Sequence, residues 1–381
     1  CGGVRPPVHR VQGLRGSARA YFLWKVAQRQ ARPALIVSEN AAQAEALFED
    51  LRSLFGENEA TPFLDRRVHL FPAYGSPPFE ELSPPPEVVA QRIEALFQLQ
   101  QGKHPLVVAP VEALLQKVAP RRFWAERWKY LAVGEEIDRD RLVAELVDWG
   151  YRRVGLVEDR GDLAVRGSIV DVFPPGSALP LRVELDGDTI TSCHSFDPSS
   201  QRSLGSHNEL LLLPVREFSA AALREERTLR AIEERAFELE VSRQHRRRIL
   251  EALEAGVVLP GIEQWLPLLF SEPLESVRAY LPEEVWLCLD GAGAVEAAME
   301  AFAEEVERRA AQCAEAQEFF VRPEALYLRP REWRQEFFSL PRVEIEPLEL
   351  LAVVEDEGHL SVRCSLTRDV KIERLPGRDE L

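Results

Sequence analysis

The chain has 381 residues, of which 45% are apolar and 29% charged, and its formal net charge is −16. Its length predicts two or three domains. The absence of any apolar run of about 18 residues argues against a membrane-spanning helix. Because contacts from Lys and Arg to phosphate dominate DNA affinity, so acidic a chain is as a whole a poor general DNA binder.

The five cysteines are scattered and never spaced as C-x-x-C, and the seven histidines form no pair with metal-ligand spacing. This pattern argues against a zinc site or a disulfide framework, so we expect no bound metal and a reducing, cytoplasmic location. The start of the chain has neither an apolar signal segment nor an initiator Met. We therefore expect a fragment or a processed product without a secretory signal.

Residues 11–26 read VQGLRGSARAYFLWKV and resemble a degenerate phosphate-binding loop. A P-loop, G-x-x-x-x-G-K-[ST], follows a strand and opens a helix. Ala18 adds a Cβ where backbone must approach phosphate, Arg19 replaces a compact ammonium with a planar fork, and Ala20 cannot ligate magnesium. We expect no nucleotide or other cofactor to bind at the matching positions, which are Gly13, Gly16, Ser17, Ala18, Arg19 and Ala20.

The first part of the chain then alternates strand and helix signals. Short runs rich in Val, Ile and Leu alternate with segments of helical period. The predicted strands are residues 33–39, 68–74 and 104–110, and the predicted helices are 41–56, 87–102 and 111–120. Continuous apolar strands between helices predict an α/β fold with a parallel sheet covered on both faces.

After about residue 126 the pattern changes to that of a small α+β segment. An amphipathic helix is predicted at residues 139–154, and strands follow it. The strand signals cover residues 167–174, 179–196 and 209–215, and the middle one reads as a hairpin around the turn DGD. The chain therefore enters an insert near residue 126 and leaves it near residue 215.

Helical signals resume at residues 221–256, which read as one long charged helix. A buried strand at 283–291 and a second long helix at 292–316 follow. This strand ends in Asp290, but Gly291 stands where an ATPase carries a Glu after the Walker B aspartate. We interpret Asp290 as a solvated strand end.

Four stretches carry a family resemblance. They are RGSIVDVFPPGSALPLRVELDGDTITSCHSFDPSSQRSL (166–204), LFPAYGSPPFEELSPPPEVVAQRIEALFQL (70–99), VVAPVEALLQKVAP (107–120) and LPGIEQWLPLLF (259–270). Together they resemble the amino-terminal module of bacterial transcription-repair-coupling factors, which is similar to the excinuclease subunit UvrB. The resemblance covers roughly residues 10–345.

The resemblance implies a single RecA-like lobe with a parallel sheet, interrupted by a small α+β domain. The expected boundaries are 1–126 for domain 1a, with the degenerate P-loop, 127–215 for domain 2, 216–345 for domain 1b, which completes the lobe, and 346–381 for a tail or the start of the next domain. A hairpin is predicted within that last segment, at residues 352–364.

The resemblance also implies a role for domain 2, which in this family docks the repair protein UvrA. The module would recruit UvrA to stalled RNA polymerase for nucleotide excision repair and would itself be catalytically inactive. In the family, the ATP-dependent DNA translocase and the polymerase-binding part lie elsewhere in the protein, and a carboxy-terminal domain covers the UvrA surface. Two alternatives stay open: a divergent UvrB-like ATPase and a DNA-binding adaptor.

The docking residues carried over from the family are Arg166, in VRGS, and Arg182, in PLRVEL. A guanidinium is a fixed fork of donors suited to carboxylates. A third family position, often Phe, is Asp186 here, preceded by the apolar Leu185. This departure removes an aromatic anchor of the kind that dominates many interfaces.

Two features have a plainer interpretation. Read without the family, Arg166 forms a structural ion pair with Asp162 or Asp171. UvrB carries an aromatic-rich β-hairpin that grips DNA, whereas the matching residues 70–86 are short and proline-rich. We interpret this segment as a buried loop.

Overall fold

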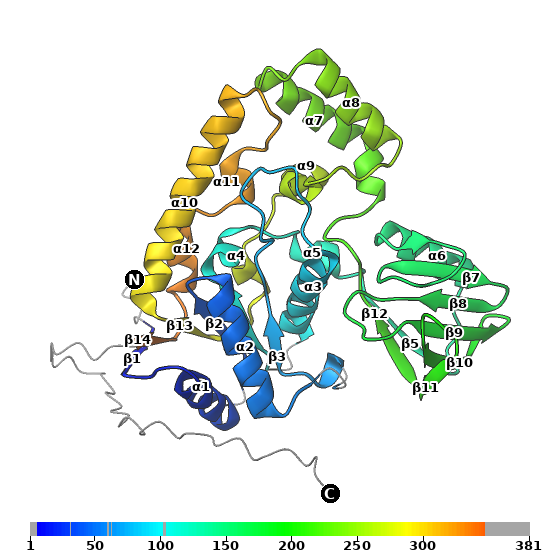
Figure 1. Cartoon of the computed structure of the whole chain (residues 1–381), viewed down its shortest axis with the longest axis horizontal. Coiled ribbons are helices and arrows are strands. Elements are labelled where there is room, and N and C mark those ends of the chain that lie inside the picture. The colour runs from blue at the N-terminus through cyan, green and yellow to red at the C-terminus, as the bar shows by residue number, and fades with distance from the viewer. Residues whose placement is uncertain (1–5, 31, 59–60, 62, 102–103, 347–381) are drawn as a thin grey trace, which may run out of the picture.

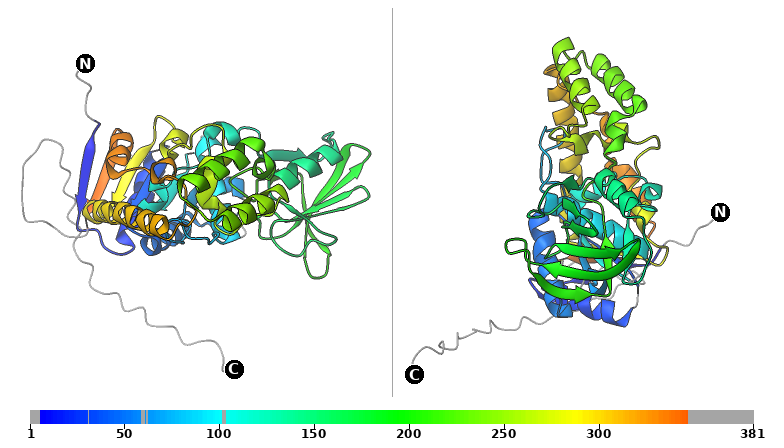
Figure 2. Two further views of the ribbon diagram at one scale, coloured as in Figure 1. Left: turned by 90° about the horizontal axis from the view of Figure 1, so that it is seen from above. Right: turned by 90° about the vertical axis from the view of Figure 1, so that its right-hand side faces the viewer.

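The computed structural model describes residues 6–30, 32–58, 61, 63–101 and 104–346. Figure 1 shows a lobe built on one sheet and, on its right, a smaller unit built on a second sheet. The views of Figure 2 confirm that the second sheet projects from one end of the lobe. The hairpin predicted at residues 352–364 lies outside the described residues.

The sheet of the lobe has six strands in the order β1-β14-β13-β2-β4-β3, and all neighbouring strands pair in parallel. Strands from the two ends of the described chain thus lie side by side. The strands are β1 (Val8–Gln12), β2 (Ala34–Ser38), β3 (Val68–Leu70), β4 (Leu106–Pro110), β13 (Trp286–Asp290) and β14 (Arg342–Glu346).

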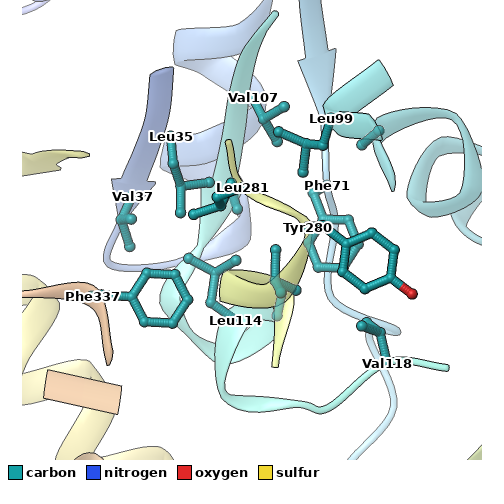
Figure 3. Packing of buried hydrophobic residues seen from close by; sticks show 14 of the residues in the cluster. Leu35, Val37, Phe71, Leu99, Val107, Leu114, Val118, Tyr280, Leu281 and Phe337 are labelled. Carbon is teal, nitrogen blue, oxygen red and sulfur yellow. The ribbon is translucent and has the colours of Figure 1, made fainter. Parts of the chain in front are cut away.

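Helices cover both faces of this sheet because the apolar side chains of its strands alternate between two cores. Ala34 and Ile36 pack toward α1 (Ala18–Arg29) and α2 (Ala41–Phe55). Leu35 and Val37 pack into the opposite core, part of which Figure 3 shows. The helices of that second face are α3 (Pro86–Gln101), α4 (Val111–Leu115), α5 (Arg121–Trp124), α10 (Ala292–Glu315) and α12 (Pro330–Phe337).

A helical layer caps the lobe. It contains α7 (Glu226–Glu238), α8 (Arg243–Glu254), α9 (Leu266–Leu269) and α11 (Pro323–Leu326), together with the 3-10 turns η2 (Ala221–Arg224) and η3 (Ile262–Trp265). The single helix predicted over residues 221–256 is wrong. The backbone takes a left-handed conformation at Glu240, and the Ser242 side chain then caps α8 by accepting from the His245 N–H. Two further 3-10 turns are η1 (Phe63–Asp65) and η4 (Val277–Tyr280).

The insert contains a six-stranded sheet in the order β11-β10-β9-β8-β7-β6, backed by α6 (Arg139–Asp148), and a separate β12-β5 pair. Its strands are β5 (Lys129–Ala132), β6 (Arg152–Arg153), β7 (Asp162–Arg166), β8 (Ile169–Val172), β9 (Leu181–Asp186), β10 (Thr189–Phe196), β11 (Ser203–His207) and β12 (Glu209–Leu212). The predicted fold class, a RecA-like parallel lobe interrupted by a small α+β insert, is confirmed.

Candidate functional site

The loop between β1 and α1 has the predicted strand–loop–helix arrangement. Gly13 and Gly16 adopt φ values of +85° and +53°, which glycine tolerates best. In a working P-loop the backbone N–H groups point at phosphate. Here the Ala18 N–H donates to the Arg15 carbonyl and the Arg19 N–H to the Gly16 carbonyl, both at 3.2 Å. The loop therefore uses part of its own anion-binding capacity internally.

The side chain of Arg19 reaches from the first turn of α1 to the end of β13. Its Nη1 lies 2.7 Å from Oδ2 of Asp290, the last residue of β13. The Asp290 side chain is 1% exposed and that of Arg19 is 23% exposed. Burial raises the pKa of Asp290, and the charge of Arg19 opposes that shift. Our interpretation of Asp290 as a solvated strand end is therefore wrong, because a residue far away in the sequence covers it.

The remaining positions of the site offer no replacement for the missing chemistry. Ala20 is fully buried and carries no metal ligand, and Gly291 follows Asp290 in a left-handed conformation. Within the described ranges, no three His, Cys, Asp or Glu side chains gather closely enough to hold a metal ion. None of the helices in those ranges is long and apolar enough to cross a membrane.

The second candidate site lies on the face of the insert sheet that points away from α6. The strand register places Asp171 of β8 opposite Arg182 of β9, and Arg166 of β7 lies at the end of the neighbouring strand. Asp171 Oδ2 accepts from Arg166 Nη2 at 2.5 Å and from Arg182 Nη2 at 3.0 Å, and its Oδ1 accepts from Arg182 Nε at 2.7 Å. The structure thus brings the two predicted arginines together through one carboxylate.

The two arginines differ in how much of each reaches solvent. The side chain of Arg166 is 44% exposed, whereas that of Arg182 is 13% exposed and that of Asp171 only 1%. Arg182 also stacks over the ring of Phe196 at 4.6 Å and donates from Nη1 to the Gln201 carbonyl at 3.4 Å. One carboxylate cannot neutralise two guanidiniums, but Glu184 and Asp186 lie on the same face of β9 as Arg182 and add negative charge beside the cluster.

Leu185 and Asp186 lie on opposite faces of β9. Asp186 is exposed and shares the face of Arg182, as the spacing of four residues requires. Leu185 is only 5% exposed and packs in the core of the insert with Val183 and Ile190. We therefore correct the assignment of Leu185: its side chain stabilises the sheet and faces away from the docking residues.

The segment predicted to be a buried loop is buried only in part. Its rings Phe71, Tyr74 and Phe79 are buried, whereas residues 81–83 and 85–86 are exposed, and no strand is present between β3 and α3. Tyr74 donates a short hydrogen bond to Glu217, and Arg92 donates to the same carboxylate at 2.9 Å. The aromatic side chains of this segment thus pack against the lobe.

Sequence reasoning missed the Arg92–Glu217 pair, which is fully buried. The Arg92 guanidinium lies between the rings of Phe71 and Tyr74, at 4.3 and 4.4 Å from their centroids. The signal was the spacing of Arg92 from Val89 and Leu96, three residues before and four residues after it, which puts it on the apolar face of α3. Because Glu217 directly follows the insert, the pair ties the exit of the insert to the lobe.

The chain was compared with known protein families and curated proteins. The family model described as the UvrB interaction domain matches residues 130–218. The transcription-repair-coupling factor of Myxococcus xanthus is 34% identical over 360 residues, which cover 92% of this chain and 30% of the relative. That of Escherichia coli is 30% identical over 334 residues, covering 87% of this chain and 28% of the relative.

A UvrABC system protein B, from Thermosipho africanus, is also similar, with 29% identity over 255 residues that cover 65% of this chain and 38% of the relative. The matched residues span about 30% of the length of these two transcription-repair-coupling factors. The UvrB interaction domain match coincides with the insert, and the flanking similarity coincides with the lobe. The chain belongs to the transcription-repair-coupling factor family, as an amino-terminal module of the UvrB-like type.

Proposed function

We propose that this module recruits UvrA through the insert and that it neither binds nor hydrolyses nucleotide. The observation that carries the proposal is the exposed guanidinium of Arg166, which the buried carboxylate of Asp171 holds beside Arg182 on the open face of the insert sheet, away from α6. The UvrB interaction domain match over the same strands supports it. An acidic surface on UvrA is the complementary partner.

Recruitment of UvrA to stalled RNA polymerase places the module in nucleotide excision repair. We propose that contacts with RNA polymerase and DNA belong to other parts of a transcription-repair-coupling factor. We also propose that a carboxy-terminal domain of such a protein covers the open face when UvrA is absent. The Arg19–Asp290 ion pair supports the lack of nucleotide chemistry. Arg19 stands at the P-loop lysine position and Asp290 at the Walker B aspartate position, and each side chain is bonded to the other.

We propose the boundaries 127–215 for the UvrA-docking domain, between the two parts of the lobe. The support is its own core, in which α6 packs on one face of the insert sheet. Expressed alone, residues 127–215 should unfold in one cooperative thermal transition with dispersed proton NMR signals. A molten spectrum would show that the insert depends on the lobe.

The test of docking is the affinity of the intact chain for purified UvrA, measured by biolayer interferometry. Arg166→Ala should weaken the complex by about 1–3 kcal/mol, as expected for a charged anchor. The matched control is Arg141→Ala, which removes the same charge from α6 on the opposite side of the sheet and should bind normally. No binding by the wild-type chain would refute recruitment, and normal binding by Arg166→Ala would refute the surface.

A further inference from the structure

The lobe contains a cavity of about 280 Å³ beyond the carboxyl ends of the neighbouring strands β3 and β4. Residues 73–78, in the loop after β3, form one part of its wall, and α4, which directly follows β4, forms another. Side chains of η3 and α10 and the ring of Tyr327 complete the wall. In open α/β sheets, ligands bind outside the carboxyl ends of the strands, so the cavity has the position of a ligand site.

Two polar groups in the wall of this cavity have no hydrogen-bond partner. Gln116 is only 4% exposed, and its buried Nε2 makes no hydrogen bond within the part of the chain that the structure describes. The Oγ of Ser76 is also buried and unbonded there. Because an unbonded buried polar group destabilises a fold, native proteins pair nearly all of them. Two such groups on one cavity indicate that it takes up a polar molecule.

Glu112 gives this cavity its charge. Desolvation raises the pKa of its carboxyl group, and no neighbouring arginine or lysine opposes that shift. The other acid of the wall, Glu305, is bonded to Arg308. Among the described residues, no arginine or lysine lines the cavity. A carboxylate without a counter-charge attracts a cation and repels a phosphate or carboxylate ligand.

Three aromatic residues line the same cavity, namely Tyr74, Phe302 and Tyr327. Both tyrosine hydroxyls are engaged elsewhere, since Tyr74 donates to Glu217 and Tyr327 donates to Gln264 at 2.9 Å. Aromatic faces attract cations through their quadrupole, so these rings suit the same kind of ligand as the free carboxylate. An apolar cavity of about 150 Å³ holds benzene, so this larger one has room for a small organic cation.

The two unbonded groups can also serve a cation, because each can accept a hydrogen bond. The Ser76 hydroxyl has free lone pairs, and a half-turn of the Gln116 carboxamide exchanges its nitrogen for its oxygen. We propose that this cavity binds a small organic cation, whose ammonium or guanidinium group donates to Glu112, Ser76 and Gln116. A short apolar body of the ligand would lie against the aromatic rings. The proposal does not rest on the docking of UvrA.

The first test titrates the intact chain with butylguanidinium and with butylurea, followed by NMR at constant ionic strength. The two compounds share their shape, but only the first is charged. Butylguanidinium should bind saturably with a Kd of about 1 mM or tighter, and butylurea at least about tenfold more weakly. Equal affinity for the two compounds would overturn the proposal, and so would the absence of saturable butylguanidinium binding.

Variants then test the location of the site. Glu112→Gln keeps the shape of the side chain and should weaken butylguanidinium binding by at least about tenfold. The matched control is Glu45→Gln, which removes the same charge from an exposed position of α2 on the opposite face of the lobe sheet and should bind normally. Phe302→Leu keeps apolar bulk but removes a ring, and a loss of about threefold is expected.

Thermal unfolding of each variant shows whether it is folded. If Glu112→Gln does not fold, Ser76→Ala replaces it and should weaken binding by about threefold through the loss of one acceptor. Normal binding by a folded Glu112→Gln, or by Ser76→Ala in its place, would overturn the assignment to this cavity. These measurements need no UvrA, so their failure would leave the proposed recruitment untouched.

A final comparison identifies the source of the cation. A blocked tripeptide with a central arginine carries the same guanidinium on a peptide backbone. If the tripeptide binds as tightly as butylguanidinium, the cavity takes the arginine side chain of another protein. If only butylguanidinium binds, the cavity takes a free amine or guanidine. Both results uphold the cation site, and both require that butylurea stays the weaker ligand.

Discussion

The closed loop of the lobe and the open face of the insert are built from the same chemical groups. In each, a strand carries an aspartate that is 1% exposed, and a guanidinium nitrogen lies 2.7 Å from its carboxylate. In the lobe, Asp290 meets one arginine within the described residues, and the charges cancel. In the insert, Asp171 meets two arginines, and the side chain of Arg166 stays 44% exposed.

The difference teaches that the exposure of the guanidinium, more than the residue type, distinguishes the two clusters. The one-to-one pair of Arg19 and Asp290 leaves no net charge for phosphate or metal to recognise. In the insert, a second arginine shares the buried aspartate, and Arg166 keeps an exposed guanidinium that a partner could reach. The contrast can be tested by removing single charged side chains from the pair in the lobe and from the cluster in the insert.

The largest effect is expected from breaking the closed pair. Arg19→Ala leaves Asp290 buried without its counter-charge, so the free energy of unfolding at pH 7 should fall by about 3 kcal/mol. Urea unfolding measures this, with Arg29→Ala at the exposed end of α1 as the control expected to change little. The deficit should shrink at acidic pH, because protonated Asp290 needs no counter-charge. A deficit below that of the control would show that the pair is not stabilising.

A partly buried acid, which makes no ion pair within the described chain, sharpens the comparison. Desolvation of Glu94 on α3, beside Gly176 of the insert, raises its pKa from 4.5 to about 7. The folded state therefore holds up to one more proton than the unfolded state between these pH values. Stability should fall by roughly 3 kcal/mol as pH rises through this window.

The variant Glu94→Gln isolates that effect. His69, whose pKa burial lowers to about 4, contributes the opposite slope between pH 4 and 6.5. The measured quantity is therefore the difference in unfolding free energy between wild type and Glu94→Gln at several pH values. A constant difference from pH 5 to 8 would show that Glu94 does not titrate in this range.

A smaller gain is expected from adding an aromatic ring to the open face. Asp186→Phe adds a ring on the face of β9 that carries Arg182 and removes a negative charge, so UvrA affinity should rise by about 1 kcal/mol. Asp186→Asn removes only the charge and should give part of the gain. Weaker binding by both variants would mean that Asp186 itself contacts a basic group of the partner.

For Mg-ATP we expect no binding at the site closed by the Arg19–Asp290 pair. Isothermal titration of the chain should give no saturable heat, and a Kd tighter than about 100 μM would contradict the proposal. Arg19→Ala should remain silent too, because Ala18 and Ala20 are unchanged. Binding that appeared only in that variant would show that the ion pair alone closes the site.

Three features could be predicted from the sequence because they depend on local periodicity or on a short motif. They are the alternation of strands and helices, the insert, and the P-loop-like segment without a lysine. The sequence did not predict the partner of Asp290, since Arg19 lies 271 positions away and only the parallel sheet brings the two together. Leu185 was misassigned for a related reason. Its neighbour Asp186 faces the other way on a strand, and adjacency in sequence does not mean a shared face.

The two buried arginines show a second limit. Arg92 and Arg182 both look like solvent-exposed charges until the rings around them are known, namely Phe71 and Tyr74 for one and Phe196 for the other. A guanidinium stacked on aromatic faces can lie deep in a protein at modest cost. Spacing indicates which face a residue occupies, but the enclosing rings come from distant segments.

The parallel contact between β1 and β14 has a consequence for synthesis on the ribosome. The bond from Arg10 to Glu344 joins residues 334 positions apart, so the lobe sheet cannot be completed until nearly all described residues have been translated. The insert, whose strands all lie between Lys129 and Leu212, can form its own sheet long before that. During the interval, β2 lacks its neighbour β13, so slow translation or limited chaperone supply should damage the lobe before it damages the insert.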